Sequence, residues 1–224
     1  MSPTEIAAIV PLPGTLARAA VVTPLAGEAA LARVVASLAG AAQHIVVSSA
    51  DALIDDAREC LAAHGLSAED VVAGGDTRMR CVAAGLEYLV GQPIPPRYVL
   101  IHDVRRPLAS AGLRDRVIEG LRTGGTAVLP ALPVTDSVKT VDEHGAITAT
   151  VDREALRTMQ YPRGFTLDRL AQLVARCSSE DFDELAESLD AGAGLTLVDG
   201  DADAFAAELP RDTDYVEAII ACRR

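Results

Sequence analysis

Short apolar runs alternate with longer amphipathic ones along most of this chain, and this alternation restricts the possible folds more than any other feature. Nearly continuous apolar runs, rich in β-branched residues, occupy residues 5–12, 44–50, 70–75, 97–103 and 126–134. Segments with helical periodicity separate them, at residues 28–40, 51–65, 78–90 and 110–125. Strands that are apolar at almost every position are buried on both faces, as in a parallel sheet covered by crossover helices. We therefore predict an α/β fold with a doubly wound, mostly parallel sheet.

The alternation of apolar runs and helical segments ends after Pro133. Two alternating stretches flank the sequence EHG within residues 136–152, which predicts a β-hairpin arm that projects from the sheet. A two-stranded arm cannot bury both of its faces alone, so we expect it to pack on something else, such as another subunit. Further helices are predicted at residues 153–160, 166–177 and 212–224, and a last strand at 195–201. Without a visible interdomain linker, we predict one domain over residues 1–224, with its arm at 136–152.

The charge and the hydropathy of the chain restrict its partners and its location. The formal net charge is −12 over 224 residues, and this acidity argues against a nucleic-acid partner. The first residues, MSPTEIAAIV, lack a basic region ahead of an apolar run, and no apolar run approaches the ~20 residues that span a bilayer. We expect a soluble, cytoplasmic protein without a membrane partner. The four cysteines are widely spaced, which favours reduced thiols, buried or half buried on helices, over a metal site.

Glycine, aspartate and arginine residues follow four of the predicted strands. In an open parallel sheet, ligands bind at the carboxyl ends of the strands. The residues at these ends are Gly14 and Arg18 after the first strand, Gly74, Gly75, Asp76 and Arg78 after the third, Asp103, Arg105 and Arg106 after the fourth, and Asp136 and Lys139 after the fifth. We expect them to form one cleft for an anionic ligand together with a divalent cation.

Each of these motifs also has a plainer interpretation. The glycines of VAGGDTRMRC let a ligand approach the backbone, but the same stretch fits an ordinary strand-to-helix turn capped by Asp76. Asp103 and the two arginines that follow it can bind Mg²⁺ and phosphate, or can form a salt-bridged surface corner. Lys139, which is the only lysine, and Arg153 after the arm are either anion ligands or cations paired or solvated at the surface.

Four stretches of the chain together resemble one family. GGDTRMRCVAAGL, VLIHDVRRPLAS, ALPVTDSVKTVDEHGAI and TVDREALRTMQYPRGF follow the order and spacing of 2-C-methyl-D-erythritol 4-phosphate cytidylyltransferase, an enzyme of the non-mevalonate isoprenoid pathway. The resemblance implies a Rossmann-like nucleotidyltransferase fold and a homodimer held through the β-arm. It implies CTP and a small polyol phosphate as ligands, with Mg²⁺ and without an organic cofactor. The implied reaction is attack of methylerythritol phosphate on the α-phosphorus of CTP, with release of pyrophosphate.

The resemblance also assigns roles to individual residues. Arg18 and Asp103 match catalytic positions, and Asp103 matches the metal position as well. The residues that match the nucleotide-binding side are Gly14, Gly74, Gly75, Asp76, Arg78 and Cys81. Those that match the polyol phosphate side are Arg106, Ser137 and Arg153.

Several positions depart from the family pattern. The first loop reads PLPGTLAR where the family has PAAGxGxR, so that Pro13 has no N–H to offer a phosphate. Leu25 and Ala206 stand where the family has its two lysines. Tyr161 and Phe182 stand where it has threonines.

The missing lysines leave three hypotheses for the function. A lysine at developing phosphate charge typically contributes about 10²–10³-fold in rate. Arg105, Arg163 and Arg80 are the cations that could compensate. The chain is then a cytidylyltransferase with an unusual charge arrangement, a nucleotidyltransferase for another sugar or polyol phosphate, or a catalytically impaired paralogue that keeps the dimer.

Overall fold

An eight-stranded mixed β-sheet forms the centre of the molecule. The computed structural model describes residues 5–66, 70–180, 182–192 and 194–223. The strand order is β10-β7-β11-β6-β1-β4-β5, and β12 also pairs with β7. The strands are β1 (Ile6–Leu12), β4 (His44–Ser49), β5 (Val71–Ala73), β6 (Tyr98–Ile101), β7 (Ala127–Pro133), β10 (Arg157–Met159), β11 (Arg163–Thr166) and β12 (Thr196–Asp199).

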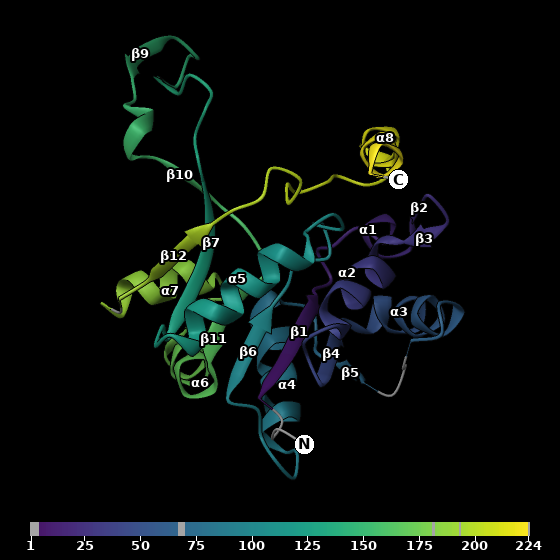
Figure 1. The fold of residues 1–224 in the computed structure, drawn as a ribbon. Helices are drawn as coiled ribbons and strands as arrows, with labels where there is room; N and C mark the ends of the chain where they lie inside the picture. The colour runs from purple at the N-terminus through teal and green to yellow at the C-terminus, as the bar shows by residue number, and fades with distance from the viewer. Residues whose placement is uncertain (1–4, 67–69, 181, 193, 224) are drawn as a thin grey trace.

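Helices cover both faces of this sheet. On one face lie α2 (Ala30–Ala39), α3 (Asp51–Ala63) and α5 (Ala111–Arg122), and on the other lie α4 (Arg78–Val90) and α6 (Leu167–Arg176) (Figure 1). Parallel pairing joins β1 to both of its neighbours, β4 to β5, and β7 to β12. The predicted α/β fold with a doubly wound, mostly parallel sheet is confirmed.

The central strand β1 shows why this sheet requires apolar residues at every position. All seven of its residues are buried. Ala8 and Val10 belong to the core beneath α2, α3 and α5, whereas Ala7 and Ile9 belong to the core beneath α4 and α6. Because successive side chains of a strand point to opposite faces, a strand covered on both sides carries no polar face.

Short side-chain caps fix two of the helices that begin at the carboxyl edge of the sheet, α4 and α5. The Thr77 hydroxyl accepts a hydrogen bond from the backbone N–H of Arg80, and the Ser110 hydroxyl accepts one from the N–H of Leu113. These contacts satisfy backbone donors that the first turn of a helix leaves free. Arg78, the first residue of α4, is therefore held at this edge.

The segment at residues 136–152, called the arm below, leaves the body of the molecule. Its strands β8 (Lys139–Val141) and β9 (Ile147–Thr150) form their own two-stranded sheet and project away from the domain (Figure 1). Val141 and Ile147 are 60% and 69% exposed. The predicted hairpin is confirmed.

The helix predicted at residues 153–160 is wrong. Asp152 accepts a hydrogen bond from the N–H of Glu154 and caps a single 3₁₀ turn, η1 (Arg153–Ala155). The chain then becomes extended, and β10 pairs antiparallel with the end of β7. Pairing with a neighbouring strand therefore outweighs the helical preference of this segment.

Five further elements complete the fold. They are α1 (Ala19–Val22), β2 (Pro24–Leu25), β3 (Glu28–Ala29), α7 (Glu184–Asp190) and α8 (Thr213–Cys222). Val216 and Ile220 of α8 share an apolar cluster with Leu25 and Leu108, which ties the carboxyl-terminal helix to the loop after β6. No helix in the described part of the chain combines the length and the apolar character needed to cross a membrane.

Replacing Gly85 with alanine is expected to lower the free energy of unfolding by about 1–2 kcal/mol. A Cβ atom at Gly85 would lie 2.7 Å from Cγ2 of Ile9, at the contact of α4 with β1. Overpacking of a core costs about 1–3 kcal/mol, which exceeds the gain of about 1 kcal/mol that alanine brings to a helix over glycine. Urea denaturation followed by circular dichroism measures the difference.

Gly112→Ala on α5 is the matched control for this steric effect. A Cβ atom there would meet its nearest neighbours at 3.8 Å, which is ordinary contact. This variant should therefore be neutral or slightly stabilising. Equal unfolding free energies for the two variants would show that α4 moves away from β1 without cost.

Candidate functional site

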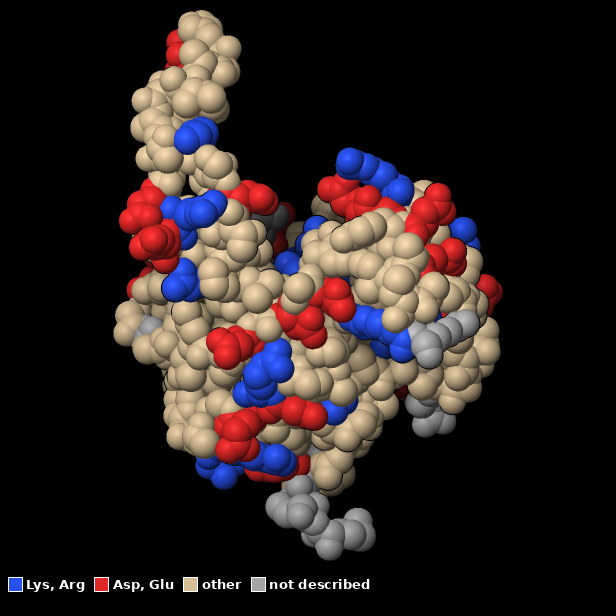
Figure 2. All heavy atoms as spheres, turned by 45° about the horizontal axis from the view of Figure 1, so that its top comes forward, with Lys and Arg blue, Asp and Glu red and all other residues tan. Residues whose placement is uncertain are grey.

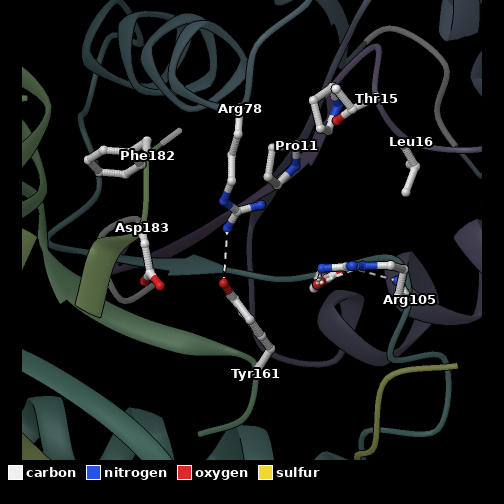
Figure 3. A pocket seen from close by; sticks show the side chains of 10 residues that line it. Pro11, Thr15, Leu16, Arg78, Arg105, Tyr161, Phe182 and Asp183 are labelled. Atoms are coloured by element: carbon white, nitrogen blue, oxygen red, sulfur yellow. Dashed lines mark hydrogen bonds and ion pairs between the residues drawn. The ribbon is translucent and has the colours of Figure 1, made fainter. Parts of the chain in front are cut away.

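A cleft of about 350 Å³ opens at the carboxyl edge of the sheet. Three groups of residues line it: the end of β1 with the loop after it, the first residue of α4 together with the loop after β6, and two segments from the second half of the chain. The lining residues are Pro11, Pro13, Thr15, Leu16, Arg78, Asp103, Arg105, Tyr161, Phe182 and Asp183 (Figure 3). The structure therefore brings together the ends of the first and fourth predicted strands and the start of the helix after the third.

The loops after β1 and β5 are joined by their backbones. The N–H of Gly14 donates to the carbonyl oxygen of Asp76 at 2.8 Å. Gly75 has a φ of +78°, a conformation that glycine adopts without strain. A Cβ atom at Gly74 would lie 2.9 Å from Cα of Cys81, so glycine permits the close approach of α4. The conformation and packing of this turn therefore account for both glycines. Asp76 accepts the hydrogen bond from Gly14 through its backbone carbonyl oxygen.

Glu184 lies at the centre of a buried charged cluster beneath the cleft. Its side chain is fully buried, and its Oε1 accepts from Nη2 of Arg78 at 2.5 Å. Its Oε2 accepts from Nη1 of Arg163 at 2.8 Å and from the hydroxyl of Tyr161 at 3.2 Å. Asp183 accepts a second bond from the same Arg163 nitrogen at 2.6 Å. Two arginines, two carboxylates and a phenol are thus held as one unit.

Three guanidinium groups surround the ring of Tyr161. The Cζ atoms of Arg163, Arg106 and Arg78 lie 4.3, 5.5 and 5.7 Å from the ring centroid. Burial would lower the pKa of Arg78, but Glu184 and its other anionic neighbours outweigh it and raise that pKa. Burial and the nearby Glu184 raise the pKa of the Tyr161 phenol. Arg78 therefore stays charged and the phenol stays neutral, and Figure 3 shows both side chains facing the cleft.

Asp103 is paired with the arginine two residues further along the chain. Oδ1 of Asp103 accepts from the backbone N–H of Arg105 at 3.0 Å, and Oδ2 accepts from its Nη2 at 2.7 Å. The carboxylate side chain is 7% exposed, whereas that of Arg105 is 54% exposed. Burial would raise the pKa of Asp103, but the Arg105 hydrogen bonds and charge outweigh it and lower that pKa. Asp103 is consequently an anion at neutral pH.

Arg106 and Arg18, two of the four predicted cations that lie outside the lining of the cleft, contact other parts of the domain. Arg106 donates to the backbone carbonyl groups of Ala204 and Met159, so its polar contacts tie together three segments of the chain. Arg18 points to Asp56 on α3, with two contacts of 2.6 Å, and its side chain is 68% exposed.

The predicted residues of the arm lie at its base. Ser137 and Arg153 line a separate hollow of about 330 Å³ between the two ends of the arm. Arg153 donates to the backbone carbonyl of Thr135. Lys139 donates to the hydroxyl of Thr150 at 2.8 Å, across the two strands of the arm. The structure thus does not place these residues on the lining of the larger cleft.

Sequence reasoning assigned no role to several residues that form the cleft. Tyr161, Phe182 and Asp183 line it, and Glu184 supports it from below. The signal was present in the departures from the family pattern, because Tyr161, Arg163 and Phe182 all differ from it. The structure joins these departures in one cluster.

Cys81 is expected to react with a thiol reagent such as DTNB at pH 8 about 10²-fold more slowly than an ordinary thiol. It is fully buried, and burial raises its pKa to about 11. The thiolate fraction at pH 8 is then about 10⁻³, against about 0.2 for a free thiol of pKa near 8.5. Mass spectrometry of partly labelled protein should show the exposed Cys222 modified first. Equal labelling of both would contradict the buried placement.

A family model, curated relatives and a solved structure agree on one family. The family model described as 2-C-methyl-D-erythritol 4-phosphate cytidylyltransferase matches residues 6–222. A protein of that name from Rhodococcus jostii is 37% identical over 182 residues, which are 80% of this chain and 76% of the relative. A namesake from Streptomyces coelicolor is 34% identical over 191 residues, 80% of this chain and 68% of the relative. The crystal structure of the Thermus thermophilus protein of that name has a TM-score of 0.77 at 28% identity and covers 97% of this chain and 99% of its own.

Proposed function

Because the chain belongs to the 2-C-methyl-D-erythritol 4-phosphate cytidylyltransferase family, we propose that it transfers a cytidylyl group from CTP to methylerythritol phosphate in the non-mevalonate pathway to isoprenoids. An oxygen of the substrate phosphate attacks the α-phosphorus of CTP. The bond between that phosphorus and the oxygen bridging to the β-phosphate breaks, and pyrophosphate leaves. The products are CDP-methylerythritol and pyrophosphate.

The observation that carries this proposal is the position of two arginines in an otherwise acidic protein. The net charge of the chain is −12, yet Arg78 and Arg105 both line the cleft at the carboxyl edge of the sheet. Transfer of a phosphoryl-type group depends mainly on positioning the reactants and on stabilising the developing negative charge. The Arg78 guanidinium can bind phosphate oxygens in a defined geometry, and the Arg105 guanidinium neutralises the Asp103 carboxylate beside them.

The proposed roles of the other residues follow their places along the edge. Gly14 and Asp76, joined by a backbone hydrogen bond, form the nucleotide side together with Gly74, Gly75 and Cys81. Arg106 supports the acceptor side by fixing the loops around Tyr161. Ser137 and Arg153 contribute from the base of the arm, and Arg18 contributes once it leaves Asp56.

A resident magnesium ion does not fit the residues of this site. Both oxygens of Asp103 are hydrogen-bonded to Arg105. We therefore assign no step of the reaction to a protein-bound cation.

We also propose that the protein is a homodimer joined through the arm, and that it acts in the cytoplasm. The apolar side chains of Val141 and Ile147 lie exposed on the arm and would be covered by a second copy. Figure 2 shows the arm as a mostly uncharged projection above a body on which acidic and basic groups are interspersed. Analytical ultracentrifugation of the full chain and of the Ile147→Lys variant tests the dimer.

The proposed reaction is tested by pyrophosphate release from CTP and methylerythritol phosphate, beside a family enzyme that carries both lysines. Release that requires both substrates supports the proposal. Release from CTP with another sugar or polyol phosphate, but not with methylerythritol phosphate, would mean that the other phosphate is the true acceptor. If this protein releases no pyrophosphate at concentrations up to the micromolar range, while the control enzyme is active, the chain is a catalytically impaired paralogue.

A further inference from the structure

Asp103 faces a cation that belongs to its own chain. The Arg105 guanidinium lies along the carboxylate, with Nε 3.1 Å from Oδ1 and Nη2 2.7 Å from Oδ2. The backbone N–H of Arg105 adds a third donor at 3.0 Å from Oδ1. A planar guanidinium binds a carboxylate in this paired geometry more selectively than a single ammonium group does. Both residues of the pair line the cleft.

The backbone holds Arg105 in place on both sides. Its N–H is bonded to Asp103, and its carbonyl oxygen accepts from the N–H of Ala207 at 2.7 Å. The preceding residue, Val104, is buried. These contacts fix the backbone from which the Arg105 side chain starts, and the bonds to Asp103 hold its guanidinium, although that side chain is 54% exposed.

A divalent ion would have to displace this guanidinium to reach Asp103. Magnesium binds proteins through one or two carboxylates together with substrate phosphates, and it needs those carboxylate oxygens free. Here each oxygen of Asp103 already accepts from Arg105. The buried carboxylate side chain, 7% exposed, would otherwise repel any phosphate that enters the cleft.

We propose that the Arg105 guanidinium serves as a built-in cation that takes the place of a divalent metal ion at Asp103. The phosphates of a nucleotide then bind in the cleft without a metal ion on that carboxylate. Arg105 is thus a positioning residue that acts through Asp103. The nucleotide part of the proposal rests on the proposed function, whereas the metal part concerns the free protein alone.

The metal part is tested by titrating the free protein with Mn²⁺ and measuring water-proton relaxation. Wild type and Asp103→Asn should give the same binding curve. Arg105→Gln should gain Mn²⁺ affinity by at least about threefold, and the double variant Arg105→Gln with Asp103→Asn should lose that gain. Mn²⁺ binding by wild type that Asp103→Asn abolishes would overturn the proposal. So would an Arg105→Gln variant that binds Mn²⁺ no better than wild type does.

The nucleotide part is tested by calorimetric titration with CTP, in EDTA and in excess Mg²⁺. Wild type should bind with dissociation constants within about threefold of each other in the two buffers. Arg105→Gln should bind about tenfold more weakly in EDTA, because a bare carboxylate then faces the phosphates, and Mg²⁺ should restore most of the loss. The double variant should recover affinity in EDTA without Mg²⁺.

Two further results would contradict the nucleotide part. An equal loss for Arg105→Gln in both buffers, without recovery in the double variant, would mean that Arg105 contacts phosphate directly. If the wild-type protein binds CTP only in the presence of Mg²⁺, a metal ion is still required for nucleotide binding, and Arg105 does not replace it. The matched control is Arg58→Gln on α3, which removes an exposed positive charge away from the cleft and should change neither ratio. If no variant binds CTP, the proposed function fails, and the Mn²⁺ titration still decides the role of Arg105.

Discussion

Replacing Glu184 with glutamine is expected to lower the free energy of unfolding by about 3–5 kcal/mol. The fully buried carboxylate accepts from Arg78 at 2.5 Å and from Arg163 at 2.8 Å. Glutamine keeps the size of the side chain but removes its charge. It leaves two largely buried guanidinium groups, of which Arg163 keeps a direct carboxylate partner, Asp183, and Arg78 keeps none among the residues that the structure describes. An uncompensated buried charge costs several kcal/mol. Equilibrium urea denaturation, followed by circular dichroism, measures the loss.

Glu87→Gln is the control for this variant. Glu87 lies exposed on α4, so its replacement removes the same charge from the surface of the same region. The expected change is below about 0.5 kcal/mol. A loss for Glu184→Gln no larger than this would show that the two arginines are solvated when Glu184 is removed, and that the cluster contributes little to stability.

Replacing Arg78 with glutamine is expected to lower kcat/KM for cytidylyl transfer by about 10²–10³-fold. The hydrogen bonds that its guanidinium donates to Tyr161 and to Glu184 both use Nη2. Figure 3 shows the rest of the group facing the cleft, where it can bind phosphate oxygens. Loss of one fixed donor at developing charge typically costs about 3–4 kcal/mol in the transition state. Steady-state assays of pyrophosphate release with both substrates varied measure the effect.

Stability has to be measured beside activity for this variant, because Arg78 also contacts Glu184. Assays at a temperature where circular dichroism shows the variant fully folded separate the two effects. Arg78→Lys keeps the charge but not the planar group and should recover part of the activity. Arg58→Gln on α3 should leave kcat/KM within about twofold of wild type. A kcat/KM of Arg78→Gln equal to that of Arg58→Gln would exclude Arg78 from the reaction.

The meeting of several loops in one cleft could be predicted because it follows from topology. β1 pairs parallel with β6, so the residues that follow these two strands end at the same edge. Pro13 and Asp103, which are distant in the sequence, line the same cleft for that reason. The apolar character of the strands was sufficient to predict this arrangement, because it requires only that both faces of the sheet are covered.

The cluster around Tyr161 and Arg163 beneath the cleft could not be predicted, because it depends on a strand, β11, that has no recognisable pattern in the sequence. β11 runs antiparallel between β6 and β7 and begins at Arg163, directly after the segment that carries Tyr161. Its four residues include Gly164, and Pro162 precedes it, so the segment lacks the periodicity of a strand. A Cβ atom at Gly164 would lie 2.6 Å from Cγ1 of Val117, which shows that the close packing of α5 selects glycine there.

The direction of single charged side chains was equally beyond prediction from the sequence. Arg18 follows β1, as the cleft requires, but its guanidinium binds Asp56 on a neighbouring helix. Arg105 follows β6 and binds Asp103. Position along the chain fixes where a backbone lies, whereas the partner of a long side chain depends on which opposite charges the folded structure brings within reach.

The separate two-stranded sheet of the arm has a consequence for local unfolding. β8 and β9 pair with each other, and their exposed residues contribute little to the cores of the domain. The free energy that protects their amides from hydrogen exchange is therefore small in a single chain, unlike that of the buried β1. If a second copy covers the arm, the protection of the arm's amides increases with the fraction of protein that is dimeric, and so with protein concentration. Exchange in the arm would then slow as the protein concentration rises, while exchange in β1 would stay constant.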